Sequence, residues 1–596
     1  MGNKRKLVIL AAFLAAASSA PGAETNDVVT LAPVVVWGAR ERVAAAPVHD
    51  APWASAMPAS VAVRAQGESG TLVDLSVNGS SFSEAGIVFN GVTLRNAQTE
   101  HFNADLPVPG DWLARPRAAT GVGLFRAAAG HPAGSLSVAL EDRPERGGKA
   151  SLGVGLDGLV FGRISDLETF GVGEAGRGWV GAFGEAARAD KIDGYESNPM
   201  SRAKVGARAG FGAENWSLDA LVSWQWRDFG CTGAYGANEK YPAWEEDQTS
   251  LASATWRYDD GDDQASEVSV LWTRGRDAYW LDRDRPDFYE NTHLADSVTL
   301  HGATRRHFAD WAFVDLRGDF DAEVYSTTHH SNYSGTSPKT KNESFRRFHG
   351  SVAALPGVRL GDWELAVGAA GVAYRISDDQ KVALSYREGC RMPSFTELTY
   401  DSPDSKGTID LPLQRTRSLN LDWTWEEVAR VGLFWMRSED LVDWIKTTPS
   451  SSWKATALDP VTSFGLSGDA EWKATDALSL VPRAAVVLKE TATDCWASRY
   501  AMDYPVAACS LEATYRILEG WRASYRQGVE VWKTNPVRRG SRVRNVSRVE
   551  TTFDVPGVRG LELSLGLSDL FNQAFEVYPG QYALGFTGYL AVTYRW

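Results

Sequence analysis

The sequence lacks features that mark several large classes of proteins. Its 596 residues include only 4 Cys, too few for a disulfide scaffold or a multi-zinc protein. Acidic residues outnumber basic ones by 75 to 61, and the net charge of −14 argues against a nucleic-acid-binding protein. Beyond the N-terminus, no apolar run approaches the ~18 residues that a membrane-spanning helix needs. A helical transporter is therefore excluded.

Motifs of enzymes and of repeat proteins are also missing. The sequence contains no HExxH, GxSxG or P-loop motif, and no nucleophile turn or metal-ligand spacing organises its Ser, His and Asp residues. It has no repeat of roughly 40–50 residues, which argues against a β-propeller. We therefore predict that the protein is not an enzyme.

The first 23 residues are typical of a secretory signal peptide. Lys4, Arg5 and Lys6 give a basic start, residues 7–17 are apolar, and small residues follow. The apolar stretch is too short to anchor in a membrane as a helix. We predict that residues 1–23 are removed and that the mature protein leaves the cytoplasm.

Most of the remaining sequence alternates between apolar and polar residues. Residues 561–568, LELSLGLS, show the pattern clearly, and residues 419–425 and 590–596 repeat it. Alternate residues of a strand point to opposite faces, so each such segment has one apolar and one polar face. Convincing amphipathic helices are nearly absent after residue 145. The chain is therefore predicted to be all-β.

Two architectures explain such strands. In a soluble sandwich the apolar face packs against a second sheet, whereas in a membrane barrel it meets lipid and the polar face lines a lumen. Aromatic residues near strand ends, and tight turns that alternate with long polar loops, favour the barrel. The final segment ends in Tyr594 and Trp596, which we expect to act as the assembly signal of the closing strand.

The predicted fold is a 22-stranded antiparallel transmembrane β-barrel closed by an N-terminal plug domain. We count 22 amphipathic segments after about residue 148. The count would be 20 if residues 363–376 did not hold two strands, because two spans need ~18–22 residues and this stretch has 14. Such a barrel has a wide lumen unless something fills it. We assign residues 44–146 to the plug and residues 147–596 to the barrel.

Several stretches, in order along the chain, match one family of outer-membrane proteins. They are LAPVVVWGAR (31–40), DLSVNGSSFSEAGIVFNGVTL (74–94), NAQTEHFNADLPVP (96–109), DGYESNP (193–199), DFGCTGAYGAN (228–238), RDRPDFYENTH (283–293), SYREGCRMPSFTELTY (385–400), DLVDWI (440–445), SRYAMDYP (498–505) and SDLFNQAFEVYPGQ (568–581). The mature chain thereby resembles TonB-dependent outer-membrane receptors, most closely their cobalamin-receptor-like branch. The sequence departs from the family pattern at Asn78-Gly79, where Arg-Gly is expected, and in a shortened start of the plug.

This resemblance implies a receptor in the cell outer membrane of a Gram-negative-type bacterium. It would take up a scarce ligand, powered by the TonB-type complex of the inner membrane. Cobalamin or a related corrinoid is the ligand that the resemblance implies. A ferric-siderophore receptor, and a passive or TonB-uncoupled ligand-binding barrel, remain as alternatives.

The segment at residues 24–43 contains the candidate TonB box. An extended apolar stretch can add as a strand to the open sheet edge of a partner. The alternative is an ordinary plug strand, and the resemblance favours the box. The residues assigned to partner binding are Leu31, Pro33, Val34, Val35 and Val36.

The plug apex and the outer loops supply the candidate ligand-binding residues. On the family pattern, the polar and aromatic loop at residues 98–102 faces the incoming ligand; the alternative is a solvated plug loop. The predicted contacts are Gln98, Thr99, Glu100, His101 and Phe102 of the plug, with Tyr195, Tyr235, Phe288 and Tyr289 of the outer loops.

We predict no cofactor or metal apart from one candidate calcium site. Asp282, Asp284 and Asp287 bring three carboxylates into one long loop, and oxygen ligands suit calcium. Cys495 and Cys509 flank one predicted outer loop, so an oxidising compartment would allow a disulfide between them. The connectivity of the four cysteines cannot be read from the sequence.

Overall fold

A computed structural model gives the fold of most of the chain. It describes residues 57–66, 71–102, 104–114, 116–121, 124, 130–195, 198–236, 239–261, 264–332, 339–366, 371–402, 404–426 and 428–596. The predicted signal peptide and the candidate TonB box at residues 31–36 lie outside these residues. No described helix is long and apolar enough to cross a membrane.

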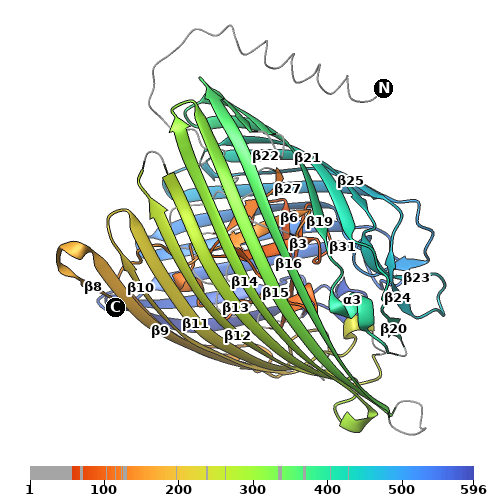
Figure 1. Cartoon of the computed structure of the whole chain (residues 1–596). Coiled ribbons are helices and arrows are strands. Elements are labelled where there is room, and N and C mark those ends of the chain that lie inside the picture. The colour runs from red at the N-terminus through yellow and green to blue at the C-terminus, as the bar shows by residue number, and fades with distance from the viewer. Residues whose placement is uncertain are drawn as a thin grey trace, which may run out of the picture.

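Twenty-two antiparallel strands form one closed barrel, which confirms the predicted fold. β35 pairs with β7 and closes the ring (Figure 1). In chain order the strands are β7 (Gly147–Gly155), β8 (Val160–Gly171), β9 (Arg177–Ala189), β10 (Met200–Gly212), β11 (Trp216–Gly230), β12 (Trp244–Asp259), β13 (Gln264–Trp280), β14 (Tyr289–Ala309), β15 (Ala312–Ser331), β16 (Lys339–Leu360), β17 (Trp363–Ala366), β18 (Gly371–Ser377), β19 (Gln380–Arg391), β21 (Gln414–Trp425), β22 (Ala429–Glu439), β25 (Val461–Ala470) continued by β26 (Trp472–Lys473), β27 (Leu478–Glu490), β29 (Pro505–Leu518), β30 (Trp521–Trp532), β31 (Val543–Asp554), β32 (Leu561–Ser568) and β35 (Thr587–Arg595).

The barrel strands turn their polar faces inward. In β32, Glu562 and Ser564 are 7% and 6% exposed, whereas Leu563 and Leu565 are 37% and 39% exposed. The same order holds in β21, where Asn420 and Asp422 are buried while their leucine neighbours are exposed. A soluble β-sandwich would bury the leucines instead. The alternation read from the sequence is therefore that of a barrel with an apolar exterior.

One hairpin of the barrel is much shorter than the others. β17 and β18 have 4 and 7 residues, beside the 22 residues of β16. The stretch at residues 363–376 therefore holds two truncated strands, and the count is 22 rather than 20. β17 pairs with β16 only over Gly357–Leu360. Among the described strands, β15 alone pairs with the rest of β16.

The plug fills the lumen with two small sheets. One joins β1 (Val61–Gln66) to β2 (Leu72–Val77); the other has the order β4–β3–β6–β5, built from β4 (Val92–Thr93), β3 (Ala85–Phe89), β6 (Gly134–Val138) and β5 (Arg117–Ala119). In Figure 1 these orange-red elements lie inside the ring of strands. Their buried apolar side chains, among them Ile87 and Phe89, form one cluster with Leu221, Leu251 and Leu271 of the wall.

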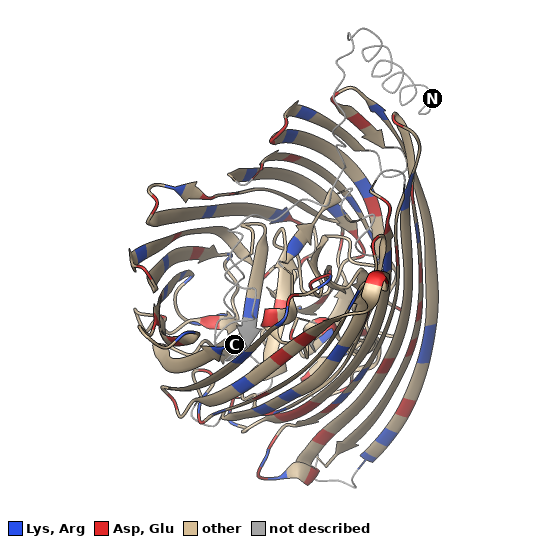
Figure 2. Cartoon of the chain, turned by 90° about the vertical axis from the view of Figure 1, so that its left-hand side faces the viewer, with Lys and Arg blue, Asp and Glu red and all other residues tan. Residues whose placement is uncertain are grey.

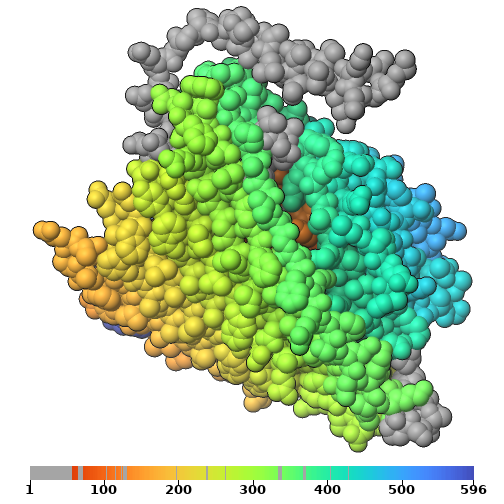
Figure 3. Space-filling view, viewed as in Figure 1, coloured from red at the N-terminus to blue at the C-terminus, as the bar shows by residue number. Residues whose placement is uncertain are grey.

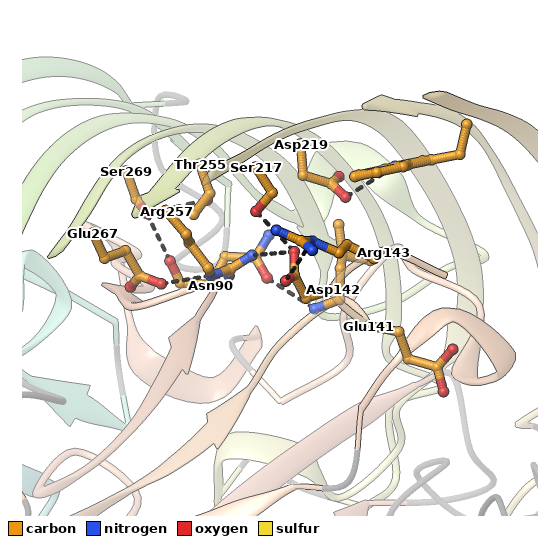
Figure 4. A network of polar contacts seen from close by, with 12 residues as sticks. Asn90, Glu141, Asp142, Arg143, Ser217, Asp219, Thr255, Arg257, Glu267 and Ser269 are labelled. Carbon is orange, nitrogen blue, oxygen red and sulfur yellow. Dashed lines mark hydrogen bonds and ion pairs between the residues drawn. The ribbon is translucent and has the colours of Figure 1, made fainter. Parts of the chain in front are cut away.

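A tight turn brings the plug close to the wall. Asn90 and Gly91 have φ values of 48° and 81°, the left-handed region that a two-residue turn between β3 and β4 requires. A Cβ on Gly91 would lie 1.8 Å from Oε1 of Glu267 in β13, so only glycine fits there. Figure 4 shows the polar contacts around this turn, in which Ser269 Oγ donates to the Asn90 carbonyl at 2.9 Å.

Buried ion pairs also join plug and wall. Asp105 of the plug accepts hydrogen bonds from Lys204 Nζ at 2.8 Å and from Arg227 Nη1 at 3.1 Å. Charged residues of both signs occur along the barrel strands and on the plug (Figure 2). Removing one partner of a buried pair leaves the other charge uncompensated, so these pairs hold the plug in one position.

The long loops gather at one end of the barrel and carry their own secondary structure. Four short strands from three loops form a sheet of order β20–β24–β23–β28, built from β20 (Ser405–Lys406), β24 (Trp453–Ala457), β23 (Val442–Lys446) and β28 (Ala497–Ser498). A hairpin of β33 (Glu576–Tyr578) and β34 (Gln581–Tyr582) and the helix α3 (Phe395–Thr399) complete this end.

Two predictions about these loops are wrong. All four cysteines are free: Cys509 lies within β29 opposite Ala484, exposed on the wall, whereas Cys495 packs in a loop cluster with Ile445. The candidate calcium site at Asp282, Asp284 and Asp287 does not form. The Asp282 carboxylate pairs instead with Arg285 at 2.7 Å, and no three His, Cys, Asp or Glu residues of the described chain could hold a metal ion.

Candidate functional site

A pocket that is partly open to solvent, with about 910 Å³ of empty space when its open part is included, lies between the plug and the long loops. The plug contributes two segments, at residues 81–83 and 98–101. The wall contributes side chains from β12, β13 and β14, and the long loops contribute residues 394–405, 442–444 and 499–500. Segments far apart in the sequence therefore meet around a single space at the long-loop end of the barrel.

Hydrogen bonds hold the plug apex against α3. The carbonyl of Gln98 accepts from Thr396, from its backbone N at 3.1 Å and its hydroxyl at 2.7 Å. Gln98 Nε2 donates to Asp277 Oδ2 of β13 at 2.6 Å. The Ser394 hydroxyl caps α3 by accepting a hydrogen bond from the backbone N of Glu397 at 3.2 Å. This cap stabilises the helix that holds the apex loop. The apex loop thus has a defined position.

His101 connects the cavity to a strand of the plug. Its Nδ1 donates to Asp74 Oδ1 of β2 at 2.9 Å, and the hydroxyl of Tyr578 in β33 donates to Asp74 Oδ2 at 2.6 Å. The His101 ring also stacks on Phe82, with 3.8 Å between ring centroids. Asp74 is buried and takes both hydrogen bonds, so it links the apex loop, the plug strand and a long loop.

Aromatic rings line one side of the cavity. The rings of Phe82 and Tyr500 meet edge to face at 5.0 Å, and Tyr235 and Tyr279 do so at 5.9 Å. Tyr400 and Trp444 form another such pair at 6.1 Å. Such surfaces bind apolar bodies and attract cations to ring faces.

Carboxyl groups line the cavity as well. Five acidic residues contribute to the lining and only one basic residue, Arg499, does so among the described residues. The acidic residues are Glu100, Glu245, Asp277, Glu397 and Asp443.

These carboxyl groups differ in their partners. Glu397 forms an ion pair with Arg391 at 2.9 Å. Glu245 accepts from the Tyr235 hydroxyl at 2.9 Å and lies beside Asp277. Oδ1 of Asp277 is buried and has no hydrogen-bond partner in the described part of the chain.

Burial changes the acidity of two groups in the plug and loops. Desolvation raises the pKa of Glu100 to about 7, against the opposing effect of Arg95. Desolvation likewise raises the pKa of Asp443 to about 6, although Ser498 and backbone N–H groups donate to its carboxylate. Both carboxyl groups therefore titrate near neutral pH, where a charged ligand bound nearby would change the fraction of each that is protonated.

The nine ligand contacts predicted from sequence fall into four groups. Gln98, Thr99, Glu100, His101 and Tyr235 line the cavity. Tyr289 lies behind the lining and donates to the Tyr400 hydroxyl at 3.3 Å. The other two side chains lie elsewhere: the Tyr195 hydroxyl donates to the Gly580 carbonyl at 2.8 Å, and Phe288 packs on Tyr241 at 5.5 Å. The side chain of Phe102 is outside the described part of the structure.

Several lining residues were not singled out from sequence. Most of them lie within a stretch that carried the family resemblance, yet nothing in those stretches says which side chain faces inward. Glu245, Asp277 and Tyr279 line the cavity from outside those stretches. The family resemblance of residues 385–400, 440–445 and 498–505 was the signal in the sequence that could have pointed to the lining residues within them. The residues concerned are Glu245, Asp277, Tyr279, His293, Glu397, Tyr400, Asp443, Trp444, Arg499 and Tyr500.

Comparison with known proteins agrees with this architecture. The family model of the TonB dependent receptor-like β-barrel matches residues 194–566. Among curated proteins, no relative is similar enough in sequence to match.

Solved structures share the fold at low sequence identity. The chain is similar to a mutant of the ferric enterobactin receptor PfeA from Pseudomonas aeruginosa, with a TM-score of 0.69 and 11% identity over 94% of this chain and 98% of that chain. It is also similar to the siderophore receptor PirA from Acinetobacter baumannii, with a TM-score of 0.66 and 10% identity over 91% of this chain and 95% of that one. Because the family model covers more than half of the sequence, the chain belongs to the TonB-dependent receptor-like β-barrel family.

Proposed function

We propose that the protein is an energised outer-membrane receptor that imports a large, scarce ligand through its barrel. The observation that carries this proposal is the cavity between the plug apex and the long loops of a filled 22-stranded barrel, which is lined by segments of the plug, the wall and several loops. The exposed leucines of the wall suit a lipid environment. The long loops would then face outward and the cavity would receive ligand from outside the cell.

Import through this barrel requires the plug to move. Asp105 and its two basic partners are buried, and separating them costs several kcal/mol, on the order of 3–5 for an uncompensated buried charge. The outer membrane has no ATP of its own. We assign residues 31–36 as the segment that a TonB-type inner-membrane complex binds and pulls, because an extended chain can add as a strand to a partner's sheet edge.

We infer that the ligand is cobalamin or a related corrinoid. The motif resemblance supports this choice, and the lining is rich in carboxyl and hydroxyl groups that can bond to the amide side chains of a corrinoid. A ferric siderophore is the second candidate, because the solved structures with this fold include receptors named for siderophores. Competition for binding between labelled cobalamin and ferric chelates separates the two.

Replacement of Val35 with Pro tests the energy input. Proline removes a backbone donor and fixes φ, which prevents strand addition. We expect unchanged binding of labelled ligand at the cell surface and loss of uptake, measured in whole cells.

Val43→Pro is the matched control in the same segment and should leave uptake intact. Uptake at the parental rate in Val35→Pro would instead favour a passive or TonB-uncoupled barrel. Loss of surface binding would point to failed assembly, which the unboiled migration of the protein in a gel detects independently.

A further inference from the structure

The charge of the cavity lining restricts the ligand further than its size does. Five acidic residues and a single arginine line the cavity among the described residues. Glu397 is neutralised by Arg391, at 2.9 Å, but Glu245 and Asp277 have no cationic partner within salt-bridge distance except His293, whose Nε2 is 4.0 Å from Asp277. Acidic side chains therefore outnumber basic ones around the cavity, and a bound cation would favour their ionised forms.

Asp277 shows that this excess of acidic groups is not compensated among the described residues. Its side chain is 5% exposed, it lines the cavity, and its Oδ1 has no hydrogen-bond donor among the described residues. The carboxyl of Glu245 is hydrogen-bonded to that of Asp277, so the two groups share a proton and carry one negative charge between them. A buried acceptor without a donor is costly, so a ligand that brings a donor or a positive charge to this point removes that cost.

The aromatic rings suit the same kind of ligand. Tyr235 and Tyr279 meet next to the Glu245–Asp277 pair, and the Tyr235 hydroxyl donates to Glu245 at 2.9 Å. Ring faces attract cations, and the attraction grows when water is excluded. A carboxyl pair beside aromatic rings is a combination of groups that binds an ammonium or another compact cation.

We propose that the cavity selects a large chelate that carries a positive charge and disfavours polyanionic chelates. This inference rests on the proposed function and adds the charge of its ligand. A ferric tris-catecholate is excluded, because six phenolate oxygens outweigh one ferric ion and the complex is anionic. A corrinoid with a cationic cobalt centre, or a ferric hydroxamate with a free ammonium group, fits.

Charge-matched pairs of probes test the proposal on the purified full-length protein. One pair is aquacobalamin, cationic at neutral pH, and neutral cyanocobalamin. The other is ferrioxamine B, which has a free ammonium group, and its N-acetylated derivative, which does not. Dissociation constants are measured by calorimetry, with a ferric tris-catecholate as the anionic probe.

In the probe pair that binds, the dissociation constant of the neutral member should be at least about tenfold that of the cationic member. The double variant Glu245→Gln/Asp277→Asn keeps the shapes of the side chains and should reduce that ratio to near one. Glu246→Gln is the matched control, since Glu246 follows Glu245 in β12, lies outside the cavity and accepts from Gln248 at 3.0 Å. Its ratio should equal that of the parent.

Three results would overturn the inference. A ratio near one in the parent, an unchanged ratio in a double variant that still migrates as a folded barrel when unboiled, or tightest binding of the tris-catecholate would each do so. In all three cases a chelate binds, so the proposed function stands. If none of the five probes binds, the proposed function itself fails and the inference falls with it.

Discussion

Single residues in this protein derive their roles from partners that are far away in the sequence. Asp74 lies in β2, where the burial pattern alone would lead one to expect a hydrophobic residue. Its acceptor atoms are used by His101 and by Tyr578, the latter 504 residues away. A buried carboxylate with two donors is stable, whereas one without them is not. The sequence shows the residue but not the donors that allow it to be buried.

The acidity of Glu100 gives a prediction at the same scale. Its pKa is raised from 4.5 to about 7 by desolvation, while Arg95, Arg391 and Arg347 lower it and Glu323 raises it. The carboxyl is therefore largely protonated at pH 6 and ionised above pH 7. We expect affinity for ferrioxamine B, whose ammonium group stays charged, to increase as the pH rises from about 5.5 to about 8.

Glu100→Gln should flatten this pH profile, as measured by calorimetry at each pH. The effect of Glu100 on stability has the opposite pH dependence to its effect on ligand affinity. The folded state binds more protons than the unfolded state between pH 4.5 and about 7, so Glu100 lowers the free energy of unfolding as pH rises across that window. A pH profile that is equally steep in the parent and in Glu100→Gln would contradict the role assigned to this residue.

At the scale of elements, most of the barrel follows from a simple pattern. β32 and β35 show strict alternation, and period-two patterns fix which face points outward once the polar face lines the lumen. β17 and β18 are different, because 14 residues cannot hold two full spans. The sequence shows that this stretch has too few residues for two full spans. Only the strand pairing in the structure shows that both strands are present as a short hairpin.

The short hairpin leaves the edge of a neighbouring strand open. Among the described residues, β17 pairs with β16 only from Gly357 onward, while β15 pairs with β16 along its whole length. Pro356, which has no N–H to donate, stands where the second pairing stops. In the space-filling view the reddish atoms of the plug are visible between green β16 and the blue-green strands that follow (Figure 3).

Hydrogen exchange should detect this edge. Successive amides of a strand point to opposite sides, so about half of the amides in residues 339–356 face the side without a paired strand. We expect about half of the amides in peptides from this part of β16 to exchange quickly, while those of β15 stay protected on both sides. Mass spectrometry on the protein in lipid nanodiscs measures this difference, and equal protection of the two strands would show that the edge is covered.

At the scale of the molecule, closure of the ring decides whether the wall is stable. β35 pairs with β7, and the backbone of Trp596 exchanges hydrogen bonds of 3.2 Å with Gly148. This pairing removes the two edges that an open sheet would have at β7 and β35, so the backbone groups of these strands are satisfied internally. Trp596 Nε1 also donates to Asp166 of β8 at 3.1 Å.

Deletion of residues 594–596 should therefore reduce the amount of assembled barrel several-fold. The fraction that migrates fast when unboiled, and that fractionates with the outer membrane, measures assembly. Asp259→Ala, at the last residue of β12 beside a short turn, is the control and should assemble like the parent. Equal assembly of the deletion and the control would mean that closure does not depend on this terminal pairing.

The sequence by itself determined the class of the fold and the strands of the barrel. These features follow from local periodicity and composition, which each segment carries independently of the others. Five residues proposed as ligand contacts line the cavity: Gln98, Thr99, Glu100, His101 and Tyr235. They were chosen because they lie in short stretches that resemble a family, and ligand contact at these positions stays a prediction.

Only the tertiary structure decided which other side chains share the cavity and which loops stay apart. The disulfide failed because strand pairing fixes Cys509 in β29 while Cys495 lies in a loop cluster. The calcium site failed because the Asp282 carboxylate pairs with Arg285. Asp277, Tyr279, Asp443 and Tyr500 come from three segments up to 223 residues apart, and they meet only after the ring closes. Alternation sets the face of each side chain, but register and closure set its neighbours, and those are properties of the whole barrel.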